Sequence, residues 1–237
     1  MLPKRMFPRR RSPASTRGRG VAAQAGFSFI EILVVMGIIS VLVSMVVVLI
    51  PNIQERGRRT KSKDNVRSMI TMMIARRTER TTGGWPPYNG KNFTLSLIAT
   101  NQLDRRNSQN LEILFSPGDT LYTLEKADQD RYKDVNKKAL KNGTDFHELT
   151  SYAGRRNADR EFLITPDQEK MGTMLICDDD EGPLHHPDGV IAGYSNGGAR
   201  FMEWEDLDMM PPENPDDPEE FLGDNASNEE LMKMWGH

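Results

Sequence analysis

The stretch that decides the fold is residues 27–50, FSFIEILVVMGIISVLVSMVVVLI. Glu31 is its only charged residue, and the nineteen residues 32–50 carry no charge. An α-helix rises about 1.5 Å per residue, so a helix of this length crosses the hydrocarbon core of a bilayer. No other segment of the chain is apolar enough to enclose this one in a soluble core. The sequence therefore predicts a single transmembrane helix over 27–50.

Charged segments flank this stretch on both sides. The first 26 residues carry seven Lys and Arg side chains and no acid, so 1–26 is a basic leader that we expect on the cytosolic side of the membrane. A second basic run between Arg56 and Arg67 follows the apolar stretch and opposes that orientation. Residues 205–237 are acidic and proline-rich, which predicts a mobile tail. Loss of the leader would move the net charge from −3 to about −10.

The residues after Pro51 change from uniformly apolar to periodic. Apolar side chains recur there at steps of three and four residues, namely Val66, Met69, Ile70, Met73 and Ile74. This period is typical of an amphipathic helix, which we assign to 51–82. The two segments together predict one long helix of about 50 residues from Phe27, with or without a kink at the proline.

Residues 83–204 form the predicted globular domain. A short helix is expected over 92–103, and 104–150 give no clear pattern. Apolar runs at 161–165 and 173–177 predict one hairpin, and those at 189–195 and 199–204 predict another around Asn196-Gly197-Gly198. The expected fold class is α+β, with the long helix packed on a small antiparallel sheet of three or four strands.

The residues of this chain do not suggest catalysis. No nucleophile triad, phosphate-binding loop or pair of catalytic carboxylates is recognisable, and Ser195 lies outside a nucleophile-elbow pattern. Cys177 is the only cysteine, so the domain must fold without an internal disulfide bond. We therefore expect no enzymatic activity.

A specific motif marks the start of the apolar stretch. Gly26 is followed by the aromatic Phe27, and Glu31 stands at the fifth position after the glycine, ahead of the apolar helix. Over about residues 20–55 this pattern resembles the cleavage and methylation motif of type IV prepilins and of type II secretion pseudopilins, and is most similar to the major pseudopilin. The resemblance implies cleavage between Gly26 and Phe27, then N-methylation of Phe27, by a membrane-bound prepilin peptidase and methyltransferase.

The same resemblance gives Glu31 a role in assembly. A carboxylate inside a membrane span is costly and therefore rare. In the family, this residue of one subunit pairs with the free amine of Phe27 on a neighbour. The alternative is that Glu31 only reaches the nearby membrane surface.

Two polar clusters contain side chains that can bind metal ions. Asp178, Asp179, Asp180 and Glu181 follow a predicted strand, and carboxylate oxygens are ligands that Ca²⁺ prefers. Major pseudopilins bind calcium near the C-terminal sheet, so the resemblance adds weight to the calcium option, and the alternative is a solvated acidic turn. His185 and His186 would suggest a transition metal, but adjacent side chains on an extended backbone point apart and no third ligand is evident.

The resemblance implies a structural subunit of a type II secretion pseudopilus. Such a subunit is anchored in the bacterial inner membrane by one span, with a periplasmic C-terminal domain. Its partners would be membrane lipid, further copies of itself, minor pseudopilins and an inner-membrane assembly platform, and no nucleic acid is expected. The alternatives are a type IV pilus pilin, or a membrane-anchored binding or enzymatic domain that uses a prepilin leader.

Overall fold

The computed structural model describes residues 27–79, 84–178, 184–211, 222, 231 and 233–235. The chain divides into two compact units, Met1–Val48 and Leu49–His237. The predicted leader, most of the predicted acidic tail and the end of the predicted long helix at 80–82 lie outside the described residues.

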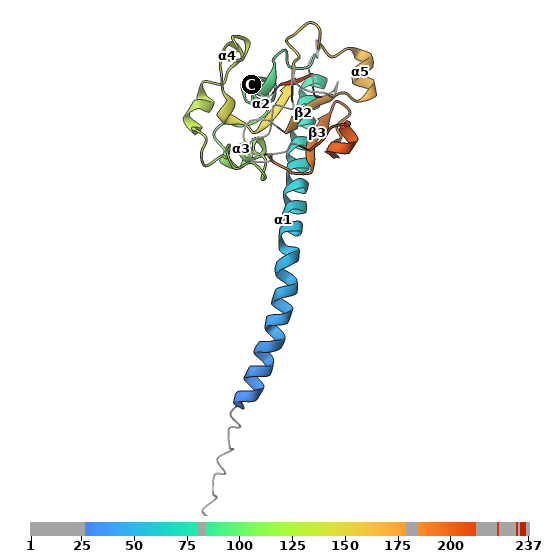
Figure 1. The fold of residues 1–237 in the computed structure, drawn as a ribbon. Helices are drawn as coiled ribbons and strands as arrows, with labels where there is room; N and C mark the ends of the chain where they lie inside the picture. Colours follow the sequence, from blue (N-terminus) through green and yellow to red (C-terminus); the bar gives the residue numbers. More distant parts are fainter. Residues whose placement is uncertain are drawn as a thin grey trace, which may run out of the picture. The chain divides into compact units, whose positions relative to one another are not determined.

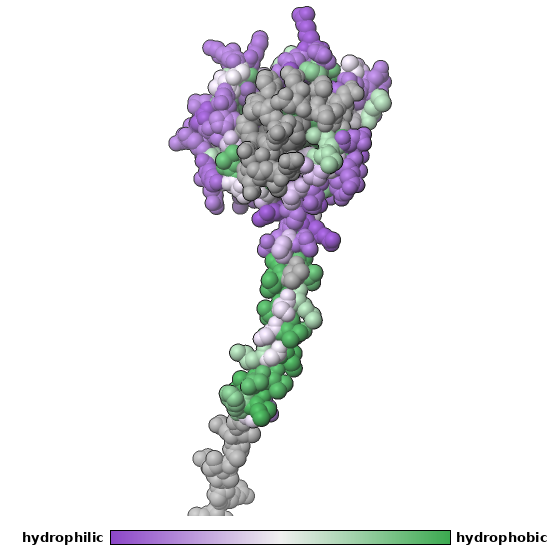
Figure 2. All heavy atoms as spheres, in the orientation of Figure 1, coloured by the Kyte–Doolittle hydropathy of each residue, from purple (hydrophilic) through white to green (hydrophobic). Residues whose placement is uncertain are grey.

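The long helix is present as α1, Phe29–Glu79, which has 51 residues and continues through Pro51. Its first part exposes apolar side chains all around, as at Leu33, Val41 and Leu49, which are 58, 55 and 56% exposed. α1 is the one helix among the described residues that is long and apolar enough to cross a membrane. Figure 2 shows the apolar side chains along this part of the helix and the hydrophilic ones that follow.

The sheet is antiparallel and its strand order is β4-β3-β2-β1-β5. Figure 1 labels the neighbouring strands β2 and β3. The strands are β1 Tyr152–Arg155, β2 Met174–Asp178, β3 Gly189–Tyr194, β4 Ala199–Glu203 and the two-residue β5 Met234–Trp235. β3 and β4 form the predicted hairpin, with Gly193 opposite Ala199. The predicted α+β class is confirmed, and β5 adds a short fifth strand at the edge beside β1.

The first predicted hairpin is wrong in one arm. Residues 161–165 are not a strand, and β2 pairs instead with β1, where Ala153 lies opposite Cys177. The intervening residues form helix α5, Pro166–Met171. Thr165 and Gln168 make a capping box at its start, and Pro166 occupies the first turn, where its missing N–H costs nothing.

The remaining helices are short, and most of them lie in the region that gave no sequence pattern. α2 covers Gly90–Ala99, which agrees with the helix expected from residue 92. The others are α3 Ser108–Leu111, η1 Glu112–Leu114, η2 Gln129–Lys133, α4 Lys137–Lys141, η3 His147–Leu149 and η4 Trp204–Leu207.

Two glycines allow helices to lie close against the sheet. A Cβ on Gly193 of β3 would lie 2.4 Å from Val66 Cγ1 and 2.9 Å from Ile70 Cγ1, so α1 packs directly on the backbone of the strand. A Cβ on Gly154 of β1 would lie 2.4 Å from the carbonyl oxygen of Gly90 at the start of α2. The apolar face of α1 that was expected from the sequence is therefore part of the core.

We expect Gly154→Ala to destabilise the globular unit by about 1–3 kcal/mol, because the added methyl group meets backbone that cannot move aside cheaply. The matched control is Gly57→Ala in α1, where an added Cβ meets nothing within 4 Å. That change should leave stability equal or raise it by up to about 1 kcal/mol, since alanine favours a helix over glycine. Thermal unfolding of the full chain in detergent measures both. Equal melting temperatures for the two variants would contradict the close α2–β1 contact.

Candidate functional site

The N-terminal motif residues lie at the exposed start of α1. Phe27 is 84% exposed and precedes the helix, which begins at Phe29. The Glu31 carboxylate accepts a hydrogen bond of 2.7 Å from the backbone N–H of Ser28. A negative charge in the first turn is also favoured by the helix dipole. Gly26 lies outside the described residues, so the structure places only the Phe27 side of the predicted cleavage site.

This geometry gives Glu31 a local role in the single protomer. Its side chain satisfies one of the backbone N–H groups that a helix start leaves without an intrahelical partner. The carboxylate remains exposed and accepts only this one hydrogen bond within the part of the chain that the structure describes. It is therefore accessible to a second partner from another molecule.

The acidic loop is only partly described. Asp178 is buried at the end of β2, where its Oδ2 accepts a 2.7 Å hydrogen bond from the backbone N–H of Ile191. Its Oδ1 lies 3.3 Å from Nδ1 of His185. Asp179, Asp180 and Glu181 fall outside the described residues. Among the residues described, no group of three or more His, Cys, Asp or Glu is placed to hold a metal ion, so calcium at this loop stays a prediction.

The two adjacent histidines point to different partners, as expected for neighbouring side chains on an extended backbone. His185 is buried between two carboxylates, with Nε2 3.3 Å from Asp119 Oδ2 on the side opposite Asp178. The Nε2–Oδ2 contact is an ion pair whose alignment falls outside hydrogen-bond geometry. His186 turns toward α1, with Nδ1 2.7 Å from Glu55 Oε1 and Nε2 3.3 Å from Ser62 Oγ.

Charge balance sets the protonation state of His185. Burial alone would lower the pKa of its imidazole, but the contacts with Asp119 and Asp178 outweigh burial and raise the pKa to about 10. The cation thus offsets the two buried carboxylates beside it. Asp119 is held in turn by the backbone N–H groups of Leu121 and Tyr122, at 2.7 and 2.9 Å from Oδ1.

A second group of charges ties the start of the globular unit to the loop before β3. Arg59 donates a 2.9 Å hydrogen bond to Glu55 and also binds Asp188, while its guanidinium lies 4.2 Å from the ring centre of Phe201. Burial would raise the pKa of Glu55, but the hydrogen bonds from Arg59 and His186 outweigh it and lower that pKa. These contacts were not predicted, although the spacing of Glu55, Arg59 and Ser62 on one helix face was visible in the sequence.

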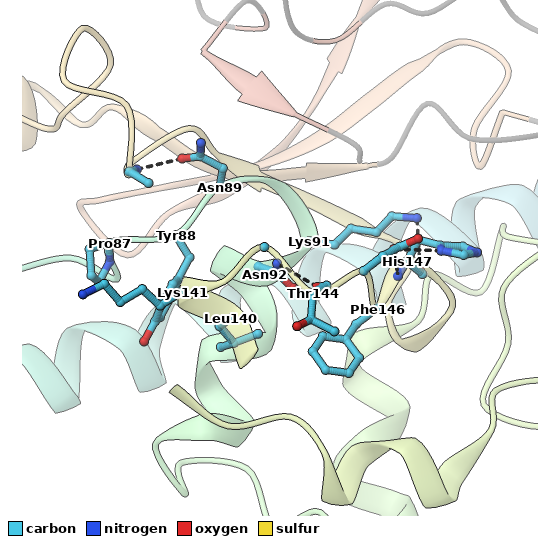
Figure 3. Close-up of a pocket in the computed structure, with 13 residues that line it drawn as sticks. Pro87, Tyr88, Asn89, Lys91, Asn92, Leu140, Lys141, Thr144, Phe146 and His147 are labelled. Atoms are coloured by element: carbon cyan, nitrogen blue, oxygen red, sulfur yellow. Dashed lines mark hydrogen bonds and ion pairs between the residues drawn. The ribbon is translucent and has the colours of Figure 1, made fainter. Parts of the chain in front are cut away.

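A surface pocket of about 380 Å³ lies beside the start of α2 (Figure 3). Several of its polar side chains are engaged with the protein itself. Lys91 Nζ donates to the carbonyl oxygen of His147 at 3.1 Å and lies 4.3 Å from the ring centre of Tyr122. Asn92 donates to the carbonyl oxygen of Thr144 at 3.2 Å. These contacts hold the loop that follows α4. They do not form a recognisable catalytic arrangement.

We expect the ion pairs of His185 with Asp119 and Asp178 to make the free energy of unfolding fall as the pH becomes alkaline. The folded protein keeps this proton up to about pH 10, whereas the unfolded chain loses it near pH 6.5. The contribution is therefore complete below about pH 6.5 and is lost as pH rises to about 10. Removing the cation by His185→Leu should cost about 3–5 kcal/mol, because two buried carboxylates lose their partner.

Chemical unfolding of the full chain in detergent, followed from pH 6 to 10, measures this dependence. The control variant is His147→Leu, whose side chain is 39% exposed. The His147 variant should show the same change of unfolding free energy with pH as wild type. The His185 variant should lose most of that change. Parallel pH curves for wild type and the His185 variant would show that this group does not carry the dependence.

Comparison with known proteins finds one relationship. The family model of the prokaryotic N-terminal methylation motif matches residues 21–47. No curated protein and no solved structure gives a significant match. The matched residues contain Gly26, Phe27 and Glu31 and the first part of the apolar helix. The motif supports a type IV pilin-like protein, of a pilus or a pseudopilus, that is processed by a prepilin peptidase and anchored in the inner membrane.

Proposed function

We propose that this chain is a structural subunit of a type II secretion pseudopilus, most like the major subunit. It would polymerise through the first half of α1 into a periplasmic filament that drives protein export. The observation that carries the proposal is the methylation motif at residues 21–47. It includes the exposed apolar start of α1, a helix that continues into the α+β domain. The pilin-like family that carries this motif is structural, and the proposal of a subunit without enzymatic activity rests on that.

The motif fits a type IV pilus pilin equally well. Cys177 favours the pseudopilus, because many pilins close a C-terminal loop with a pair of cysteines and this chain has one cysteine only. Genes for an outer-membrane secretin and a secretion ATPase beside this one, together with loss of protein export on deletion, would support the pseudopilus. Loss of surface pili with normal export would support the pilin instead.

We propose that Glu31 pairs with the amine of Phe27 on a neighbouring subunit during assembly. Within one protomer Glu31 binds the N–H of Ser28 and remains exposed. An unpaired charge moved among apolar helices costs several kcal/mol, and a partner amine offsets much of that cost. Pairing of this kind would fix the register between subunits.

The mature protein should begin at Phe27 and carry one methyl group on its terminal amine. Intact-mass measurement of protein extracted from membranes checks this. Gly26→Leu should block cleavage, because a bulky side chain enters the protease site beside the scissile bond. Gly20→Leu, a glycine in the same leader, should be processed normally. A mature species that retains Arg17 or Arg19 would refute the cleavage site.

Glu31→Gln and Glu31→Val should both be inserted and cleaved, yet enter filaments at least about tenfold less well, as a loss of about 1.4 kcal/mol would produce. Glutamine is the informative change, because its oxygen can still accept the hydrogen bond from Ser28 while the charge is lost. Quantification of subunits in sheared filaments measures incorporation. Ser44→Ala in the same apolar stretch serves as the control and should assemble normally. Normal incorporation of the glutamine variant would show that Glu31 acts only within its own helix.

A further inference from the structure

Three exposed cations surround α1 just beyond its apolar part. Arg56, Arg58 and Lys61, which we call the basic collar, are all exposed. Successive residues of an α-helix are rotated by about 100°, so Arg56 and Arg58 lie about 160° apart and Lys61 lies about 60° from Arg58. The collar therefore presents positive charge on opposite sides of the helix, within about two turns.

Within the residues that the structure describes, little neutralises this collar. Arg59, the cation between them in sequence, is committed to Glu55 and Asp188. Lys61 lies 4.0 Å from Glu112, at the limit of an ion pair between two exposed groups. Arg56 and Arg58 make no ion pair with any residue that the structure describes. Within that part of the chain, their charge remains available to a further partner.

The collar lies close, along the helix axis, to the point where the apolar surface of α1 ends. Ile53 is 66% exposed and is the last large apolar residue before the collar. From Ile53, Arg56 is about 4.5 Å and Lys61 about 12 Å further along the helix axis. Side chains of a helix tilt toward its N-terminus, so the long collar side chains lean back toward the apolar part. The polar layer of a bilayer is about 5–8 Å thick on each side, which these side chains can reach.

We propose that the basic collar binds the phosphate groups of anionic phospholipids where α1 leaves the bilayer. Arginine suits this role, since its planar guanidinium donates two parallel hydrogen bonds to a phosphate. Each cation held near an anionic surface favours association about fivefold, and the effect falls off within a Debye length. The collar thus sets the depth of the helix and selects anionic over zwitterionic lipid. This inference requires that α1 span a membrane and does not require that the chain form a filament.

An acidic surface on a second copy is the competing partner. Glu205, Asp206 and Asp208 are exposed on and beside η4 and carry the opposite charge. The lipid is favoured because the collar follows the membrane-spanning stretch on the same helix, so the bilayer surface is next to it whenever the helix is inserted. Binding to a second copy would need a separate association event.

Native mass spectrometry of the full chain, released from micelles that contain equal amounts of phosphatidylglycerol and phosphatidylcholine, tests the proposal. Wild type should retain the anionic lipid preferentially. The triple variant Arg56→Gln, Arg58→Gln, Lys61→Gln should lower the ratio of bound anionic to zwitterionic lipid at least about tenfold. Replacing three exposed lysines of α4, Lys137, Lys138 and Lys141, by glutamine is the matched control and should leave the ratio unchanged.

A conservative variant separates charge from folding. Arg56→Lys with Arg58→Lys keeps the charge and should retain most of the preference, and all variants should show the same melting temperature. An unchanged lipid ratio in the collar variant would overturn the proposal. Dimers that form without anionic lipid, and that disappear in the collar variant, would overturn it in favour of a second copy. Because filament incorporation is not measured here, failure of the pseudopilus proposal leaves this result unaffected.

Discussion

The close approach of α1 to β3 is the contact on which the globular unit depends. Val66 and Ile70 lie directly over Gly193, and a side chain on that glycine would separate the helix from the strand. The same helix also carries the apolar stretch that ends near Ile53. One element therefore has to suit both a lipid environment and an aqueous one. It does so by changing composition along its length, from apolar side chains on every face to a single buried face between Val66 and Met73.

Between these two parts, the face of α1 that meets the globular unit is polar. Ser62 and Asn65 are buried there, and Asn65 donates a 2.9 Å hydrogen bond to the carbonyl oxygen of Phe115. Ser62 shares a 2.9 Å hydrogen bond with Ser116 and also contacts His186. Buried polar groups are costly unless they are paired, so this region tolerates few alternative rotations of the helix. The apolar contacts provide stability, whereas the polar contacts define how the helix is oriented on the sheet.

Features with a local signal could be predicted from the sequence. The long helix follows from its uniform and then periodic composition, and the β3–β4 hairpin follows from Asn196-Gly197-Gly198. The N-terminal motif is recognisable because Gly26, Phe27 and Glu31 stand at fixed positions in the sequence. β1 was missed because Tyr152–Arg155 contains a glycine and an arginine and is too short to show alternation. Arg155 is buried all the same, because its guanidinium donates to the hydroxyl oxygen of Thr173 at 2.9 Å.

The surroundings of His185 could not be predicted for a different reason. Its partner Asp119 comes from a distant loop and Asp178 from the end of β2. Only the folded chain brings both carboxylates to one imidazole, and no local pattern records such a contact. Asp178 itself was singled out, but as a ligand for calcium. In the structure its carboxylate is engaged by His185 and by the backbone of Ile191. The charge-rich sequence therefore indicated an important position without indicating which partner the charge would have.

The reactivity of the single cysteine can be used to monitor opening of the sheet. Cys177 lies in β2 between Ala153 of β1 and Ala192 of β3, and it is completely buried. A thiol reagent cannot reach its sulfur while these strands stay paired and the apolar side chains around it stay packed. The rate of thiol modification in the native protein therefore measures how often the centre of the sheet opens, in the way that amide exchange measures local unfolding. The same burial protects the thiol from oxidation in any compartment that favours disulfide bonds.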